Sequence, residues 1–227
     1  MPVEHAFDSR DQASAAVADR IASLVAARLA NDDRADLVVS GGSTPVRCFS
    51  LLSKKPIDWQ NVRVVLSDER WVPSDHDDSN EKLVRELLLT DLAAVGELLS
   101  IYDAQVLVAE RCESLQQAMP EHGFACCMLG MGADGHFASL FPDADSLEVG
   151  LDPDGSAFYL PVSTAASSHP RVTMTLGAML QSDEIILLFF GAEKFDIYEQ
   201  ARSSASEFPV AHLLAQKRSP VHVYWAP

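Results

Sequence analysis

The feature that most constrains the fold is an unbroken apolar run, IILLFF, at Ile185–Phe190. A strand with one solvent-facing side alternates apolar and polar residues. A short continuous run is instead typical of a parallel sheet whose two faces are both covered by helices. Further short runs indicate strands at 37–40, Val62–Leu66, 124–129 and 221–225.

Segments with helical character separate these runs. Residues 11–30 are rich in alanine, and Val17, Ile21 and Val25 recur there at helical spacing. Further helices are predicted from Pro45 onward and at 80–92, 109–119 and 191–201. Alternating strands and helices predict an α/β fold with a Rossmann-like, mostly parallel sheet and helices on both faces. With no evident linker or repeat, we expect one domain over residues 1–227, in which the turn-rich segment 145–170 covers the site.

The net charge of the chain limits the classes of molecule that it is expected to bind. The chain has 33 acidic and 17 basic residues, a net charge of −16, which disfavours nucleic acid and anionic membranes. The first residues lack the basic and apolar regions of a signal peptide, so we expect a cytoplasmic protein, and we favour a monomer. The four cysteines have no metal-ligand spacing and are expected to be buried.

Four polar or glycine-rich loops follow predicted strands, after Ser40, Leu66, Leu129 and Phe190. In open α/β sheets, ligands bind beyond the carboxyl ends of the strands. The loops are therefore expected to converge on one site.

The third loop, LGMGADGHFASLFP, contains a G-x-G-x-x-G pattern. Dinucleotide binding also requires a helix and an acidic residue that ends a second strand. Pro142 stops any helix early, and the acidic residues that follow do not lie in a strand, so NAD binding is disfavoured. His136 with Asp134 is instead a candidate general base with its carboxylate. The alternative is a histidine that caps or braces the turn.

The other loops offer groups that bind anions. SGGSTP could cradle an anion with backbone N–H groups and hydroxyls, or could be an ordinary turn and helix cap. SDERWVP could supply a carboxylate and a cation, or could be a salt-bridged surface turn. Arg171 and Lys194 lie near strand ends. Because the chain is so acidic, a basic residue at such a position is a stronger candidate for binding an anion. The candidates in the first two loops are Gly41, Gly42, Ser43, Thr44, Asp68 and Arg70.

Taken in order, SGGSTP, SDERWVP, LGMGADGHFASLFP, PRVTMT and GAEK resemble the 6-phosphogluconolactonases of the pentose phosphate pathway, over residues 38–194. That family shares its α/β fold with the glucosamine-6-phosphate deaminases, in which a glutamate of the related loop assists opening of the sugar ring. The matching position here is Phe141, which favours a lactonase. Asp143 stands where the lactonases usually have glycine, a departure that concerns the local turn.

The resemblance implies hydrolysis of 6-phospho-D-glucono-1,5-lactone without a metal or cofactor. His136 would be the general base, and Asp134 would orient it or bind substrate hydroxyls, with Asp68 as the alternative for either role. The Gly41–Gly42 amides or Arg70 would stabilise the oxyanion. The 6-phosphate would be held by Lys194, Arg171, Ser43 and Thr44, or by Arg70.

Two other functions stay open at this stage, a sugar-phosphate isomerase or deaminase and a non-catalytic sugar-phosphate-binding regulator. The remaining histidines are expected to be surface or structural residues. They are His5, His76, His122, His169, His212 and His222.

Overall fold

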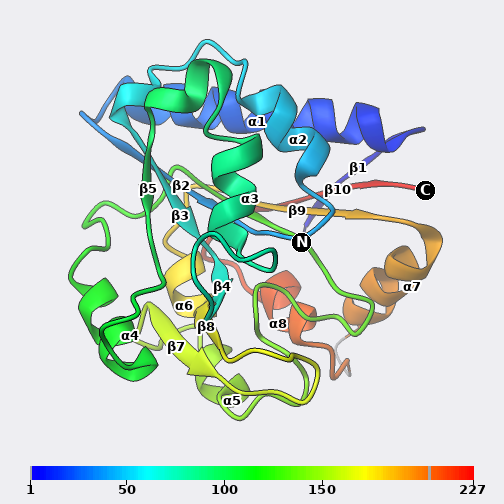
Figure 1. Cartoon of the computed structure of the whole chain (residues 1–227). Coiled ribbons are helices and arrows are strands. Elements are labelled where there is room, and N and C mark those ends of the chain that lie inside the picture. The colour runs from blue at the N-terminus through cyan, green and yellow to red at the C-terminus, as the bar shows by residue number, and fades with distance from the viewer. Residues whose placement is uncertain (1, 204–205) are drawn as a thin grey trace.

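The computed structural model describes residues 2–203 and 206–227, and its core is a seven-stranded parallel sheet (Figure 1). The strand order is β1-β10-β9-β6-β2-β3-β5. The central strands β2, β6 and β9 are buried on both faces, which explains why Asp36 of β2 is their one charged residue. The strands are β1 (Val3–Ala6), β2 (Ala35–Val39), β3 (Val62–Leu66), β5 (Glu97–Leu99), β6 (Cys126–Leu129), β9 (Ile185–Phe190) and β10 (Val221–Ala226).

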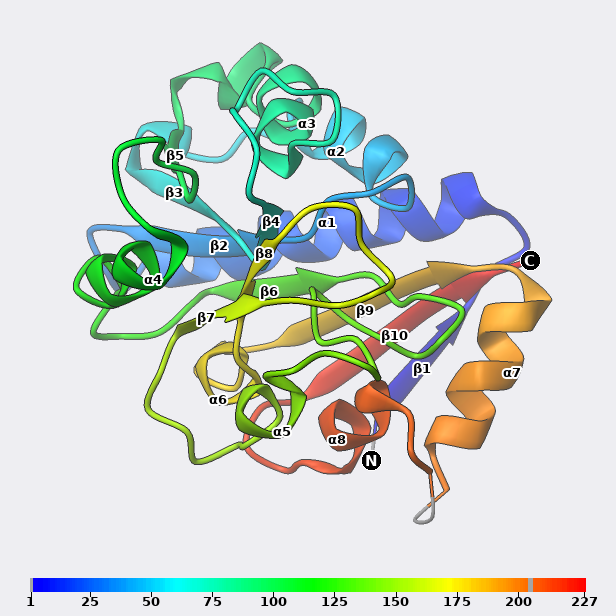
Figure 2. The same cartoon turned by 60° about the horizontal axis from the view of Figure 1, so that its bottom comes forward.

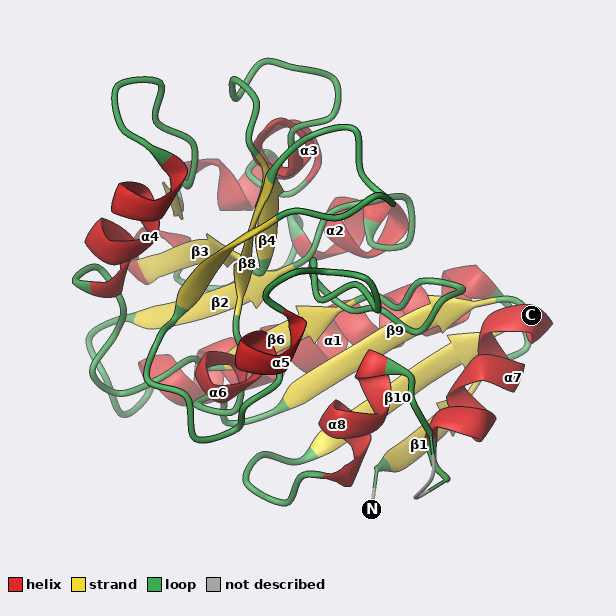
Figure 3. Ribbon diagram, turned by 90° about the horizontal axis from the view of Figure 1, so that it is seen from below, coloured by secondary structure: helices red, strands yellow, loops and turns green. Residues whose placement is uncertain are grey.

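Helices cover both faces of this sheet. One face carries α1 (Arg10–Leu29), α2 (Val46–Leu52) and α3 (Asn80–Leu87), and the opposite face carries α5 to α8 (Figures 1 and 3). The predicted α/β fold with a mostly parallel sheet and helices on both faces is confirmed. The other helices are α4 (Val108–Gln116), α5 (Leu147–Gly150), α6 (Leu176–Met179), α7 (Ala192–Ala201), α8 (Pro209–Ala215) and the 3₁₀ turns η1 (Trp59–Asn61) and η2 (Asp91–Val95).

Helix α1 shows how the sequence produces these layers. Ser9 caps its first turn by accepting a hydrogen bond from the Gln12 N–H. Its buried face, which includes Val17, Ile21 and Val25, packs across β2, β6, β9 and β10. Burying each such side chain stabilises the fold by about 1.5–3 kcal/mol before entropy is counted.

The four strands that precede the predicted loops are neighbours in the sheet. Val39 at the end of β2 pairs with Leu66 on one side and Met128 on the other, and Leu129 pairs with Leu187 of β9. Chain order reverses between β2 and β6, which makes this a topological switch point. The loops after β2, β3, β6 and β9 consequently emerge along one edge.

A second, antiparallel sheet stands at that edge (Figure 2). It contains β4 (Asp68–Arg70), β8 (Arg171–Met174) and β7 (Tyr159–Val162), in the order β4-β8-β7. The expectation that 68–70 is loop is therefore wrong, and the turn-rich segment 145–170 contains strand β7 and the short helix α5. Strand β4 is short and polar, and its partner lies a hundred residues away, so periodicity gives no sign of it.

Several boundaries also shift. The helices predicted at 80–92 and 109–119 end earlier, at Leu87 and Gln116, and the strand predicted at 124–129 begins at Cys126. The four cysteines are buried and free, as expected, and burial raises the pKa of the Cys112 thiol to about 11. Within the described ranges, no helix is both long and apolar enough to cross a membrane.

Candidate active site

A pocket of about 220 Å³ opens at the carboxyl edge of the large sheet, at the switch point. Its walls come from the loops after β2 and β6, from β4 and β8 of the small sheet, and from the first turns of α3 and α7. A larger hollow of about 460 Å³ near α7 and α8 contains none of the predicted residues. The predicted residues that line the pocket are Gly41, Gly42, Ser43, Thr44, Asp68, Arg70, His136, Arg171 and Lys194.

Asp134, the remaining predicted residue, contacts His136 directly. Its Oδ1 atom lies 2.5 Å from Nδ1 of the imidazole. An ionised carboxylate can only accept, so Nδ1 carries a proton, and in the neutral imidazole Nε2 is then the nitrogen with the lone pair. Burial opposes ionisation of Asp134, but hydrogen bonds from the ring and backbone of His136 prevail and lower its pKa. The side chain of His136 is 27% exposed, so the ring remains accessible.

Glycines allow this compact arrangement. A Cβ atom on Gly132 would lie 2.3 Å from the His136 ring, and one on Gly135, which has φ +75°, would meet Phe208 at 2.8 Å. The Gly132 N–H donates to the His136 carbonyl at 2.9 Å. A bridge between Phe137 and Leu140 follows in place of the helix that a dinucleotide fingerprint requires.

Phe141 lies between two functional candidates. Its ring centroid is 4.2 Å from that of His136, and the Arg171 guanidinium carbon lies 5.2 Å from the Phe141 ring centroid. The Phe141 side chain is buried. The residue at the deaminase glutamate position is therefore an apolar support for the imidazole and the guanidinium.

Asp68 is bound to other groups than His136. It accepts hydrogen bonds from Ser139 Oγ at 2.6 Å and Ser67 Oγ at 3.1 Å, and its Oδ2 lies 3.5 Å from Nη1 of Arg171. Burial lowers the pKa of Arg171, and the Asp68 charge opposes this shift. Asp134 is therefore the carboxylate that contacts His136, and Asp68 is the one that contacts Arg171.

Arg70 and Arg171 are directly opposite each other in the β4–β8 register. Nη1 of Arg70 donates to the Asp78 carbonyl at 2.5 Å. Its Nε atom is buried and has no hydrogen-bond partner among the described residues. The pocket wall thus carries two guanidinium groups, one with an unused donor.

Lys194 and the loop after β2 supply further donors. Within the described part of the chain, Lys194 forms no ion pair, and the backbone N–H groups of residues 41–44 donate no hydrogen bond. Burial lowers the pKa of Lys194, while the charges of Glu193 and Asp134 oppose the shift. Together with Gly42 at φ +85°, these groups form a surface suited to an anion.

Three buried residues around the site were not predicted. Glu69 accepts from the N–H groups of Arg70, Asn80 and Glu81 and from Ser79 Oγ, at 2.7–3.0 Å, and so anchors the start of α3. Burial raises the pKa of its carboxyl group, although these hydrogen bonds favour the charged form. Asn80 donates to the Asp68 carbonyl, and Ser139 to its carboxylate. Ser79 before Asn80 is a helix-cap signal, but nothing local marks Glu69 or Ser139.

Known proteins share this architecture. Residues 8–225 match the family described as glucosamine-6-phosphate isomerases/6-phosphogluconolactonase. The chain is 35% identical to a 6-phosphogluconolactonase of Rhizobium meliloti, with 98% of each chain covered. It is 36% identical to one of Mesorhizobium japonicum, over 98% of this chain and 94% of the relative. The crystal structure of a 6-phosphogluconolactonase from Shewanella baltica, 35% identical, superposes with a TM-score of 0.93 over 100% of this chain and 98% of that one. The chain belongs to the glucosamine-6-phosphate isomerase/6-phosphogluconolactonase family.

Proposed function

We propose that the protein hydrolyses 6-phospho-D-glucono-1,5-lactone to 6-phospho-D-gluconate in the pentose phosphate pathway, in the cytoplasm. The observation that carries the proposal is the contact between Asp134 Oδ1 and His136 Nδ1, beside a pocket with two arginines and a lysine. A lactone requires a base for water attack, and a phosphate requires cations. Relatives named 6-phosphogluconolactonase support the substrate.

In the proposed reaction, Nε2 of His136 takes a proton from a water molecule as its oxygen attacks C1 of the lactone. The Asp134 carboxylate stabilises the resulting imidazolium and keeps Nδ1 protonated. The tetrahedral intermediate then collapses by breaking the bond between C1 and the ring oxygen. His136 returns its proton to that oxygen, and the product is an open-chain acid.

The oxyanion at C1 and the 6-phosphate require donors at opposite ends of the substrate. We assign the oxyanion to Arg70, whose buried Nε atom is unpartnered among the described residues, or to the Gly41–Gly42 amides. The phosphate falls to Lys194, Arg171, Ser43 and Thr44, which line the same pocket. Arg70, directly opposite Arg171, is the alternative phosphate ligand, and the Gly41–Gly42 amides alone would then face the oxyanion. Asp68 serves in this scheme by holding Arg171.

Glucosamine-6-phosphate isomerisation or deamination is the second candidate, because the family includes those enzymes. The buried ring of Phe141 argues against it, since it packs 4.2 Å from the imidazole where the deaminases carry a ring-opening carboxylate. A regulator that only binds sugar phosphates would not require the Asp134–His136 pair.

The test is hydrolysis of freshly prepared lactone by wild type, His136→Ala and a matched control, His212→Ala, which alters an exposed histidine on α8. We expect wild type and the control to exceed the spontaneous rate, and His136→Ala to lose about 10²–10⁴-fold in kcat. Full turnover by His136→Ala would overturn the base assignment. The lactonase assignment would be overturned if folded wild type did not accelerate lactone hydrolysis and instead acted on glucosamine-6-phosphate, or only bound sugar phosphates.

A further inference from the structure

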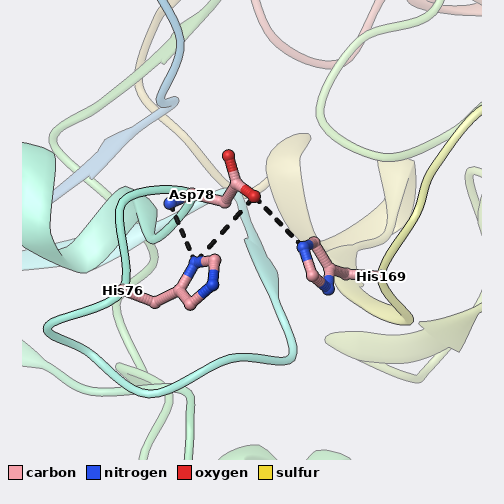
Figure 4. Close-up of side chains that lie close together, drawn as sticks. All are labelled: His76, Asp78 and His169. Carbon is pink, nitrogen blue, oxygen red and sulfur yellow. Dashed lines mark hydrogen bonds and ion pairs between the residues drawn. The ribbon is translucent and has the colours of Figure 1, made fainter.

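Two loops beside the pocket bring His76, Asp78 and His169 together, with their side chains pointing toward one another (Figure 4). The loop after β4 carries His76 and Asp78, and the β7–β8 loop carries His169. We propose that these three residues bind one divalent transition-metal ion, with zinc the best match. This site is separate from the Asp134–His136 pair, and the proposal does not depend on the lactonase assignment.

The donor atoms are close to a coordination geometry. Oδ2 of Asp78 lies 3.1 Å from Nε2 of His169 and 3.9 Å from Nδ1 of His76. One ligand atom from each residue lies within 4.8 Å of the others. Tetrahedral zinc, with bonds of about 2.0–2.1 Å, places its ligand atoms about 3.3 Å apart. The separations therefore have to close by about 1.5 Å at most.

The ligand types select the class of metal. Two imidazoles and one carboxylate suit zinc, cobalt, nickel or copper, whereas magnesium and calcium prefer oxygen ligands. Three protein ligands leave a position for water, as in zinc sites that are open to solvent. The side chains of His76, Asp78 and His169 are 42%, 53% and 29% exposed, so an ion can enter.

Hydrogen bonds already hold the loops in place. The Trp71 N–H donates to the Pro170 carbonyl at 2.8 Å, next to the β4–β8 pairing. Ser167 Oγ donates to the carbonyl of His169 at 2.9 Å. The Asp78 N–H donates to Nδ1 of His76 at 3.1 Å, which keeps a lone pair on that nitrogen directed at Asp78. Metal binding at Nδ1 would exchange this single hydrogen bond for coordination.

The surrounding charge favours a cation. Asp75 and Asp77 flank His76 in the sequence, and only Asp77 has an ion-pair partner among the described residues, Lys82. The opposing charges are Lys82, which pairs with Asp77, and Arg70, which donates to the Asp78 carbonyl. The site thus combines aligned ligands with a net negative loop.

The site also lies on the segments that hold both pocket arginines. Arg70 donates to the Asp78 carbonyl, and Arg171 Nε donates to Ser167 Oγ, two residues before His169. A metal ion bound by both loops would link the segment that contacts Arg70 to the segment that contacts Arg171. We therefore expect zinc to raise Tm in a concentration-dependent way, as any ligand of the folded state does.

The test is calorimetric titration of the full chain with ZnCl₂, together with the visible spectrum of the Co²⁺ complex, which reports coordination number. We expect one equivalent to bind wild type. Asp78→Asn, His76→Ala and His169→Ala should each weaken binding by at least the 10–100-fold that loss of a supporting partner costs. His212→Ala is the matched control and should bind as wild type does.

His136→Ala distinguishes this site from the pocket, because zinc held by the Asp134–His136 pair would be lost in that variant. Saturable binding that survives His136→Ala and is lost in the three loop variants supports the proposal. Absence of saturable binding to wild type, unchanged binding in the loop variants, or loss in His136→Ala would each overturn it. Metal-free Tm values show whether a loop variant is folded, and His169→Gln, similar in size, replaces His169→Ala if it is not.

Discussion

Oδ1 of Asp134 accepts two hydrogen bonds from a single residue, one from the imidazole Nδ1 of His136 at 2.5 Å and one from its backbone N–H at 3.2 Å. One oxygen atom thereby fixes both the turn and the orientation of the ring. It also determines the tautomer, since the proton must lie on Nδ1.

Replacing Asp134 by asparagine should therefore reduce kcat by about 10²–10⁴-fold, with little change in fold. The asparagine amide can donate to Nδ1, which moves the ring proton to Nε2 and blocks its use as a base. Steady-state kinetics on the lactone measures the effect. Asp33→Asn, an exposed change outside the pocket, is the control, and equal kcat in the two variants would show that Asp134 does not set the tautomer.

Lys194 should oppose stability while it supports binding. Burial lowers its pKa below the ordinary value of 10.5, so the unfolded chain binds this proton more tightly than the folded protein does. Stability attributable to Lys194 must then rise with pH through the window between the folded pKa and 10.5.

At pH 7, Lys194→Met should accordingly increase the free energy of unfolding and weaken binding of 6-phosphogluconate by about 10-fold or more. Guanidinium denaturation at pH 7 and above pH 10, with Lys54→Met as the exposed control, tests the first effect. The stability gain should shrink at the higher pH. A gain that is absent, or identical at both values, would contradict the burial argument.

Gly41→Ala should disturb Asn80. The added Cβ would lie 1.9 Å from Asn80 Oδ1, while Asn80 Nδ2 holds the Asp68 carbonyl. We expect a loss of about 1–3 kcal/mol in stability, as for other overpacking. Gly42→Ala is the matched control, because a Cβ added there meets no atom within 4 Å, so the substitution costs only the backbone strain of φ +85°, about 1–2 kcal/mol.

A double-mutant cycle separates the two effects. Asn80→Ala should partly restore the stability of Gly41→Ala, whereas it should add independently to Gly42→Ala. Equal coupling in the two cycles would mean that the steric contact is not the cause.

Glu69→Gln should destabilise the protein by about 2–4 kcal/mol, because an amide nitrogen would face donors that now share a carboxylate. Urea denaturation measures the change. Glu86→Gln, an exposed substitution on α3, the helix whose start Glu69 anchors, should be nearly neutral. Similar losses of stability in both variants would mean that the charge near α3, and not the hydrogen bonds of buried Glu69, is responsible.

The sequence predicted the bounds of strands and helices best where burial alone determines which residues belong to them. Strands β3 and β9 have the predicted bounds because their apolar runs stop abruptly at Ser67 and Gly191. Strand β4 was missed since Asp68–Arg70 has no apolar alternation, and its position depends on pairing with Arg171–Met174.

Site residues divide in the same way. The four loops were predictable because parallel strands present their carboxyl ends at one edge, and nine predicted residues line one pocket there. The sequence could not predict which carboxylate contacts His136 and which contacts Arg171, since both Asp68 and Asp134 follow strands. The meeting of His76 with His169 depends on two loops that only the small sheet brings together.

The register that places Arg70 opposite Arg171 also bears on the protein without substrate. Like charges directly opposite each other repel across an antiparallel pair. Burial lowers the pKa of Arg171 and the Arg70 charge adds to that shift, although the Asp68 charge opposes it with a larger effect than that of Arg70. A doubly charged anion bound between the two guanidinium groups would reduce their mutual repulsion. Sulfate should consequently raise Tm above sodium chloride of equal ionic strength, even though it is neither substrate nor product, and the excess should vanish in Arg70→Met.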